Sequence, residues 1–276
     1  MQANTNISQS VPTQRAAGGS IDYPTWNKVS QNTVLPNENY ESQVSFEEQG
    51  SFSIRDYVFL LFAIRKTYVS RSDRQKAFYA IVKRGLDLLI SLTLVLLTIP
   101  LFLFIAFLIK ITSRDSIFFK HRRLGQGGKL FWCYKFRTMY SDAEERLSKS
   151  PELQRQFEES FKIQNDPRIT PLGALLRKTS LDELPQLFQV IRGEMSLVGP
   201  RPIVERELSK YSFYGNKLLS VKPGLSGLWQ ISGRSEVAYP ERVLMDMHYI
   251  DYRCIMLDLQ LILLTPLAVF RGHGAC

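Results

Sequence analysis

An uncharged run of 22 residues, from Leu88 to Ile109, limits what this chain can fold into more than any other feature. About 20 apolar residues are enough to cross the hydrocarbon core of a bilayer. A soluble domain in a chain of this size has few places to bury so long an uncharged run. The run therefore predicts a segment that enters a membrane.

Two details indicate how this segment sits. Pro100 lies near its centre, where proline removes a backbone hydrogen bond and favours a kink. Basic residues flank both ends, and they are Lys83 and Arg84 before the run and Lys110, Arg114, Lys120, Arg122 and Arg123 after it. Because Lys and Arg favour the cytoplasmic side, two basic flanks fit a segment that enters and returns on that face. We expect a re-entrant helical hairpin bent at Ile99-Pro100, with a kinked span as the alternative.

The charge of the chain is unevenly distributed. The net charge is +9, and residues 1–50 carry −3, so residues 51–276 carry about +12. A basic body favours anionic partners such as nucleic acid, a phosphorylated substrate or the cytoplasmic lipid surface. The first 50 residues are rich in Asn, Gln and Ser, which predicts a disordered tail without a signal peptide. The three cysteines show no metal or redox spacing and favour a reduced, cytoplasmic compartment.

After Thr112 the pattern predicts a small mixed domain. Residues 117–119 and 129–137 are strand-like, and Gly125 to Gly128 between them favours a hairpin turn. Helical patterns follow, at 141–161, 172–178, 181–191 and 241–270. The last of these ends in an apolar piece that is too short to span and suits the membrane interface. A short apolar helix is expected at 57–64.

These patterns predict an α+β, mainly helical fold in four parts. Residues 1–50 form the tail, 51–77 a linker with the short apolar helix, 78–112 the re-entrant membrane hairpin and 113–276 a small cytoplasmic domain. The domain carries a short β-hairpin and interfacial amphipathic helices.

The octapeptide from Thr179 to Gln186 holds the residues that are best suited to catalysis or ligand binding. Asp182 and Glu183 are adjacent at a predicted helix start, Ser180 and Glu183 match a capping box, and Pro185 suits a first turn. Backbone N–H groups and the helix dipole favour anions there. A carboxylate held beside cations can face a phosphate, share a divalent metal with it, or attack it. Ordinary helix capping is the alternative.

Several cations stand beside Gly or Pro, which fix the backbone, rather than along a solvated helix face. A guanidinium fixed in this way suits phosphate, because its planar fork binds two oxygens. Any single one of them fits an ordinary exposed side chain in a loop, but as a set they predict a site for a multiply phosphorylated substrate. The set comprises Lys135, Arg137, Arg168, Arg201, Lys222 and Arg234. The three histidines lack metal-ligand spacing, and no nucleic-acid motif is recognisable.

The ordered motifs resemble those of a known family. Arg84-Gly85-Leu86-Asp87 precedes an apolar run broken at Pro100, and later blocks follow in the same order. These blocks are Lys135 to Met139, Asp166 to Thr170, Leu181 to Gln186, Ser196 to Pro202 and Lys222 to Gly227. Roughly residues 78–276 resemble the bacterial sugar transferases, that is, the monotopic polyprenyl-phosphate hexose-1-phosphate transferases of the undecaprenyl-phosphate galactose/glucose phosphotransferase type.

The resemblance implies an Asp-Glu pair that works with Mg²⁺. Asp182 would attack the sugar-bearing phosphate of a UDP-sugar and expel UMP, and undecaprenyl phosphate would then take the phospho-sugar from the aspartate. Glu183 would hold the metal, although a role as base stays open. Contacts to phosphate are expected from Arg177, Arg201 and Arg234, and from Lys135, Arg137 and Arg168.

The implied partners are a UDP-sugar, undecaprenyl phosphate and lipid of the bacterial inner membrane at its cytoplasmic face, without nucleic acid. UDP-galactose and UDP-glucose are favoured, an N-acetylated sugar stays open, and so does a homodimer. The competing hypothesis is a basic membrane-surface scaffold that holds anionic lipid without catalysis.

Overall fold

The computed structural model describes residues 72–113, 116–160, 163 and 166–271 of the chain. The predicted tail at 1–50 and the predicted short helix at 57–64 lie outside these residues. Within them the fold is mainly helical, with two small two-stranded sheets. This agrees with the predicted fold class.

The apolar run forms the central part of one long helix, α2 (Asp73–Ser113). Most of its large apolar side chains face outward, and Leu97, for example, is 73% exposed. By length and composition α2 could cross a membrane. A large exposed apolar surface on an otherwise basic chain is what a membrane segment needs.

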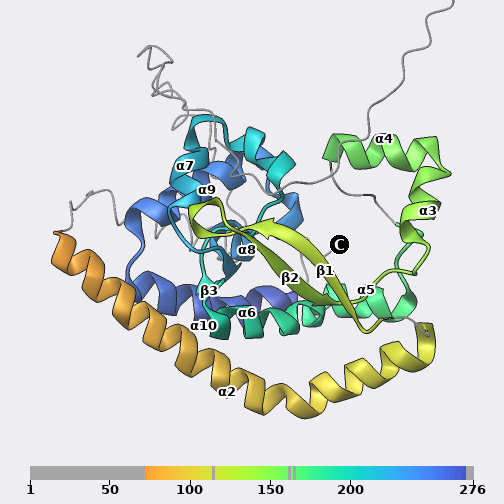
Figure 1. Cartoon of the computed structure of the whole chain (residues 1–276), viewed down its shortest axis with the longest axis horizontal. Coiled ribbons are helices and arrows are strands. Elements are labelled where there is room, and N and C mark those ends of the chain that lie inside the picture. Colours follow the sequence, from red (N-terminus) through yellow and green to blue (C-terminus); the bar gives the residue numbers. More distant parts are fainter. Residues whose placement is uncertain (1–71, 114–115, 161–162, 164–165, 272–276) are drawn as a thin grey trace, which may run out of the picture. The chain divides into compact units, whose positions relative to one another are not determined.

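The structure has one continuous helix where a re-entrant hairpin was predicted. α2 continues through Pro100 as one curved helix, without two arms folded against each other (Figure 1). Proline removes one helical hydrogen bond and bends a helix, but the turns before and after it keep their own bonds, so no reversal of direction is required. The predicted hairpin bent at Ile99-Pro100 is therefore not confirmed, and re-entry into the membrane stays a prediction.

Polar contacts fix the first half of α2 to the rest of the fold. Arg84 donates from Nη1 to the carbonyl of Val190 at 2.6 Å and from Nη2 to that of Ile191 at 2.7 Å. The buried Asp87 carboxylate accepts from the backbone N–H of Leu197 at 3.0 Å. Nearer the start of the helix, Lys83 donates to the buried Asp258 at 3.1 Å. The membrane segment is thereby held in a defined position against the domain.

The β-hairpin forms as predicted. β1 (Phe118–Leu124) pairs antiparallel with β2 (Leu130–Phe136), and the short helix η2 (Gln126–Gly128) closes it. Gly127 has a φ of 69°, a conformation that favours glycine. Phe136 packs with Ile105 and Leu176, so the end of the hairpin joins α2 to α5.

Helices form in the predicted segments and in several others. They are α3 (Ala143–Ser148), α4 (Pro151–Ser160), α5 (Pro171–Lys178), η3 (Leu181–Gln186), α6 (Leu187–Arg192), η4 (Glu205–Tyr214), α7 (Gly215–Leu219), α8 (Leu228–Ser232), η5 (Arg234–Glu236), α9 (Tyr239–Tyr252) and α10 (Ile255–Arg271). The larger hydrophobic core includes Val190, Leu197, Leu228 and Leu261, from α6, β3, α8 and α10.

A second, parallel pair of strands was not predicted. β3 (Ser196–Val198) pairs with β4 (Gly224–Ser226), and both are buried. Just beyond β3 the backbones of Gly199 and Gly224 touch, since a Cβ placed on Gly224 would lie 2.1 Å from the Gly199 nitrogen. The segments Gly199-Pro200 and Pro223-Gly224 therefore cross each other in direct backbone contact. Only glycine fits at this crossing of the two Gly-Pro motifs.

Candidate active site

The carboxylate pair lies on a 3₁₀ turn, η3, which leads directly into α6. Ser180 does not form the predicted capping box. It has a φ of 54°, in the left-handed region, and its side chain makes no capping bond. Its carbonyl, instead of its hydroxyl, accepts from the Glu183 N–H at 3.2 Å. The tight turn after α5 requires this conformation, and it replaces the extended backbone of a normal N-cap.

The 3₁₀ geometry sorts the side chains of η3 by threes, because residues i and i+3 eclipse each other. Glu183 and Gln186 share one edge and line a polar recess. Leu181 and Leu184 share another edge and pack toward α2. Asp182 occupies the third edge and is 8% exposed. A single turn therefore presents its two carboxylates on two neighbouring edges and an apolar face on the third.

Lys135 is the cation nearest to the pair. It comes from β2, and its Nζ donates to Glu183 Oε1 and lies 3.9 Å from Asp182 Oδ2. Its neighbour Phe136 is buried beneath the hairpin, which anchors the strand at this point. Lys135 therefore lies beside the acidic pair, and its predicted contact with phosphate stays a prediction.

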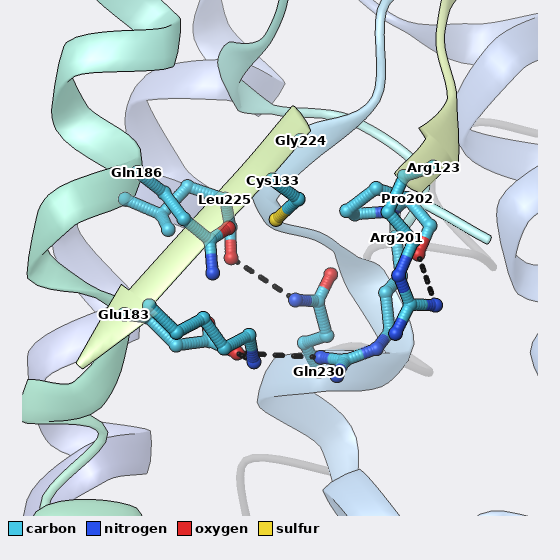
Figure 2. A pocket seen from close by; sticks show the side chains of 10 residues that line it. Arg123, Cys133, Glu183, Gln186, Arg201, Pro202, Gly224, Leu225 and Gln230 are labelled. Atoms are coloured by element: carbon cyan, nitrogen blue, oxygen red, sulfur yellow. Dashed lines mark hydrogen bonds and ion pairs between the residues drawn. The ribbon is translucent and has the colours of Figure 1, made fainter. Parts of the chain in front are cut away.

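Arg201 reaches Glu183 from the crossing of the two Gly-Pro motifs. Its Nη1 lies 3.6 Å from Glu183 Oε1, and its guanidinium lies 5.9 Å from the centre of the Trp229 ring. Figure 2 shows Arg201 and Glu183 pointing toward each other across the recess. The contact of Gly199 with Gly224 fixes the backbone just before Arg201, so the cation is held in advance of any ligand.

The two carboxyl groups titrate in opposite directions. Burial raises the pKa of Asp182, and the charge of Lys135 offsets this only in part. Burial alone would also raise the pKa of Glu183, but Lys135 and Arg201 outweigh it and lower that pKa to about 2. Environments that separate the pKa values of two neighbouring groups assign them different roles. Glu183 is a fixed anion, and Asp182 carries the more basic oxygen.

Two more predicted cations act on the pair from a distance. The charge of Arg177 lowers the pKa of Asp182, although by less than Lys135 does. Arg177 Nε donates to the Thr138 hydroxyl at 2.9 Å, which orients the guanidinium. Arg234 is among the charges that lower the pKa of Glu183. Both residues therefore belong to the surroundings of the pair, as expected.

Arg168 and Arg137 are placed differently. Arg168 is buried, and its Nε and Nη2 bond both carboxylate oxygens of Asp166 at 2.7 to 3.1 Å. A bidentate, buried pair of this kind stabilises the loop rather than leaving a guanidinium ready for phosphate. Arg137 Nε donates to the Ser116 carbonyl at 2.8 Å. Their predicted role in phosphate binding is not supported by these contacts.

The recess beside Glu183 is narrow and partly open to solvent, and its cavity volume is about 10 Å³. Sequence reasoning missed three of its polar residues, Arg123, Gln186 and Gln230. Gln186 stood within the octapeptide, and its spacing of three from Glu183 was the available signal. Arg123 is largely buried, and burial followed by the charge of Arg201 lowers its pKa. Two guanidinium groups held close together favour an anion between them.

The donor set fits a magnesium ion that binds together with a diphosphate. The described residues contain no cluster of three or more His, Cys, Asp or Glu side chains that could hold a metal alone. Mg²⁺ usually binds through one or two carboxylates and takes its other ligands from substrate phosphates and water. Asp182 and Glu183 beside a cationic recess provide such a set, with Glu183 as the expected protein ligand.

A second recess lies on the apolar edge of η3. It encloses about 340 Å³ and is lined by Leu184, Leu187 and Phe188 on one side and by α2 from Val95 to Leu103 on the other. Its only polar side chain, Thr98, bonds back to the Leu94 carbonyl at 2.7 Å. An apolar recess therefore begins one residue away from the carboxylate pair, at the bend of the membrane helix.

Comparison with known proteins places the chain in a family. The model of the family described as bacterial sugar transferase matches residues 78–272. The exopolysaccharide production protein ExoY of Rhizobium meliloti is 46% identical over 197 residues, which cover 70% of this chain and 87% of that protein. The undecaprenyl-phosphate galactose phosphotransferase of Salmonella typhimurium is 38% identical over 247 residues, covering 88% of this chain and 50% of that protein.

A third relative carries the name of a different sugar. The UDP-N-acetylgalactosamine-undecaprenyl-phosphate N-acetylgalactosaminephosphotransferase of Aeromonas hydrophila is 35% identical over 204 residues, which cover 71% of this chain and 45% of that protein. The matched region contains α2, the β-hairpin, η3 and the crossing that holds Arg201. This chain belongs to the bacterial sugar transferase family.

Proposed function

We propose that this protein transfers a hexose-1-phosphate from a UDP-sugar to undecaprenyl phosphate, giving undecaprenyl-diphospho-sugar and UMP. The observation that carries the proposal is the position of η3. One 3₁₀ turn holds a buried carboxylate pair against Lys135 and Arg201 on its polar side, and borders an apolar recess on its other side. A site for a phosphate thus adjoins a site for a hydrocarbon chain.

In the first step an Asp182 carboxylate oxygen attacks the phosphorus that bears the sugar. The bond from that phosphorus to the bridging oxygen breaks, and UMP leaves with the oxygen and its electron pair. Asp182 is suited to this step because its pKa is raised, which makes its oxygen the more basic of the two carboxylates. Lys135 and Arg201 stabilise the charge that develops on the phosphates.

In the second step a phosphate oxygen of undecaprenyl phosphate attacks the same phosphorus. The bond between phosphorus and Asp182 breaks, the carboxylate is restored, and the diphosphate-linked sugar leaves. Dividing the transfer in this way lets one site serve a soluble and a lipid substrate in turn. The recess between Leu184 and α2 is where the first part of the polyprenyl chain would lie.

We place the site at the cytoplasmic face of the bacterial inner membrane, with α2 entering and leaving on that face. The basic residues at both ends of its apolar part, Lys83, Arg84 and Lys110, support this placement. Bound with the diphosphate and Glu183, Mg²⁺ would neutralise charge as UMP leaves. The donor is UDP-galactose or UDP-glucose in our proposal, and the relative named for N-acetylgalactosamine is the reason to test that sugar as well.

The experiment measures UMP release by the full chain in lipid nanodiscs with Mg²⁺, undecaprenyl phosphate and a panel of UDP-sugars. We expect release with one class of sugar, and its loss in Asp182→Asn and after chelation. Asp251→Asn is the matched control, because Asp251 is exposed on α9 and pairs only with Lys217 at the surface. Anionic lipid binding without UMP release from any donor would instead favour the basic scaffold.

A further inference from the structure

Gln186 is a largely buried residue, of which only 2% is exposed. Among the residues that the structure describes, none donates to its amide oxygen or accepts from its amide nitrogen. The amide atoms are not among the fully buried polar atoms without a partner, so the small exposed part of the residue includes the amide. Because Gln186 lines the polar recess, this amide is open to a ligand there.

The amide of Gln186 faces the polar recess. Gln186 follows Glu183 by three residues, so the 3₁₀ turn directs both side chains to the same edge. Figure 2 shows Gln186 and Glu183 reaching into the same space, with Leu225 and Gln230 behind them. The Gln230 Nε2 donates to the Leu225 carbonyl at 3.0 Å, whereas its Oε1 is a buried acceptor without a partner among the described residues. Gln186 is thus the amide of this recess for which neither polar atom has a partner among the described residues.

The chemistry of the amide selects its ligand. Phosphate oxygens at neutral pH accept hydrogen bonds, and Lys135, Arg201 and Arg123 already supply donors in this recess. An amide offers both a donor and an acceptor, and a hydroxyl group matches both. The part of a nucleotide sugar that carries hydroxyls and lies next to the transferred phosphate is the hexose ring.

We propose that Gln186 binds a hydroxyl group of the sugar and so contributes to the choice of donor. This inference rests on the proposed function. It assigns the polar edge of η3 to the sugar and leaves the opposite, apolar edge to the lipid. The sugar remains on the enzyme through both steps while UMP leaves after the first, so the contact with Gln186 acts in both.

The test combines a protein variant with altered substrates. The full chain in nanodiscs is compared with Gln186→Met, which keeps the length of the side chain and removes its hydrogen bonds. kcat/KM is measured for the best UDP-hexose and for each of its monodeoxy analogues. Gln126→Ala is the matched control, because Gln126 is exposed on η2 and bonds only to the Ser220 carbonyl at 2.9 Å.

We expect the wild type to reject one monodeoxy analogue by about tenfold or more, since its largely buried amide would then stay unpaired. Gln186→Met should lose about the same factor on the full sugar and should no longer distinguish that analogue. The effects of removing either partner of one contact are not additive. UMP should inhibit the wild type and the variant equally, which also shows that the variant site is folded.

Three outcomes would overturn the inference. One is a wild type that treats every monodeoxy analogue like the full sugar, a result that needs no variant. Another is a variant that keeps the discrimination of the wild type. The third is a variant with weakened UMP inhibition and unchanged sugar preference, which would place the amide against the uracil. Absence of UMP release by the wild type with every donor would instead refute the proposed function.

Discussion

At the scale of single residues, the site depends on how two cations and two carboxyl groups share a small volume. Lys135 bonds Glu183 and also lies 3.9 Å from Asp182. Arg201, from the segment that follows β3, lies 3.6 Å from the same oxygen of Glu183. Glu183 thereby neutralises two cations, and Asp182 keeps a raised pKa despite its surroundings. Asp182 and Glu183 lie close together because they are adjacent in sequence. Their pKa values differ because Lys135 and Arg201 lie closer to Glu183.

The first prediction concerns Lys135. Lys135→Met should lower kcat for UMP release by about 100-fold or more, because it removes a fixed positive charge from the position where phosphate charge develops. Lys135→Arg should retain more activity than Lys135→Met. Lys129→Met, at an exposed position of the same hairpin, should behave like the wild type. Steady-state kinetics in nanodiscs would measure this, and an unchanged kcat in Lys135→Met would exclude Lys135 from the site.

The second prediction concerns a buried carboxyl behind Trp229. Burial raises the pKa of Asp246 to about 7 from its ordinary value of 3.8, although the hydrogen bond from Tyr211 and the charges of Arg242 and Arg201 oppose this. A raised folded-state pKa contributes stability that is complete below about pH 4 and is lost as pH rises through about 7. The difference between the raised and the ordinary pKa of Asp246 corresponds to about 4 kcal/mol in the free energy of unfolding.

The measurement is thermal unfolding of detergent-solubilised protein between pH 4 and pH 8. Relative to Asp246→Asn, the wild type should lose stability as pH rises through this range, because asparagine cannot ionise. Parallel pH profiles for the two proteins would show that Asp246 does not titrate there.

At the scale of elements, η3 is the part that lies between the polar recess and the apolar recess. Its period of three places Leu184 against α2 and Glu183 against the recess. In an α-helix the residues three and four positions after Glu183 both lie near its face, whereas in the 3₁₀ turn Gln186 lies directly in line with Glu183. Pro185 indicates an irregular turn but does not specify its pitch.

The third prediction concerns the apolar recess. Val95→Phe should partly fill it and raise KM for undecaprenyl phosphate several-fold, while stoichiometric UMP release in the absence of acceptor stays unchanged. Leu97→Phe is the matched control, since Leu97 is on the same helix and 73% exposed. Equal KM values for Val95→Phe and the wild type, or a slower first step, would refute a role of this recess in holding the lipid chain.

Some elements follow from local sequence and others do not. Gly125 to Gly128 between two alternating runs predicts the β-hairpin, since the turn and the strands are adjacent in sequence. β3 and β4 are only three residues each and pair over a long separation, so no local pattern reveals them. Arg168 next to Asp166 was equally ambiguous, because the same motif suits an internal ion pair and a phosphate contact.

At the scale of the whole molecule, α2 and the domain are held together by buried polar contacts. Asp87 and Asp258 lie inside the fold and accept bonds from the domain and from α2 respectively. Breaking a buried ion pair by removing one partner is strongly destabilising, so these contacts hold α2 in a fixed position against the domain. The sequence predicted the apolar run but not its shape, because proline allows a range of bend angles.

The fourth prediction is topological. In a cysteine-free background, single cysteines at Arg74 and Ser116, beyond the two ends of the apolar run, should react with a membrane-impermeant reagent only when the cytoplasmic face is exposed. This follows from the basic residues at both ends of the run. Labelling of the two positions from opposite sides would show that α2 spans the membrane instead of returning.

The central claim is that Asp182 carries the phospho-sugar between the two substrates. The most direct measurement is intact-protein and peptide mass spectrometry after brief incubation with the donor UDP-sugar and Mg²⁺, without undecaprenyl phosphate. We predict one equivalent of UMP, a mass increase of one hexose phosphate on the peptide that contains Asp182, and loss of that mass on addition of undecaprenyl phosphate. Asp182→Asn should show none of these. UMP release that needs both substrates at once, from a protein that never gains mass, would contradict the account.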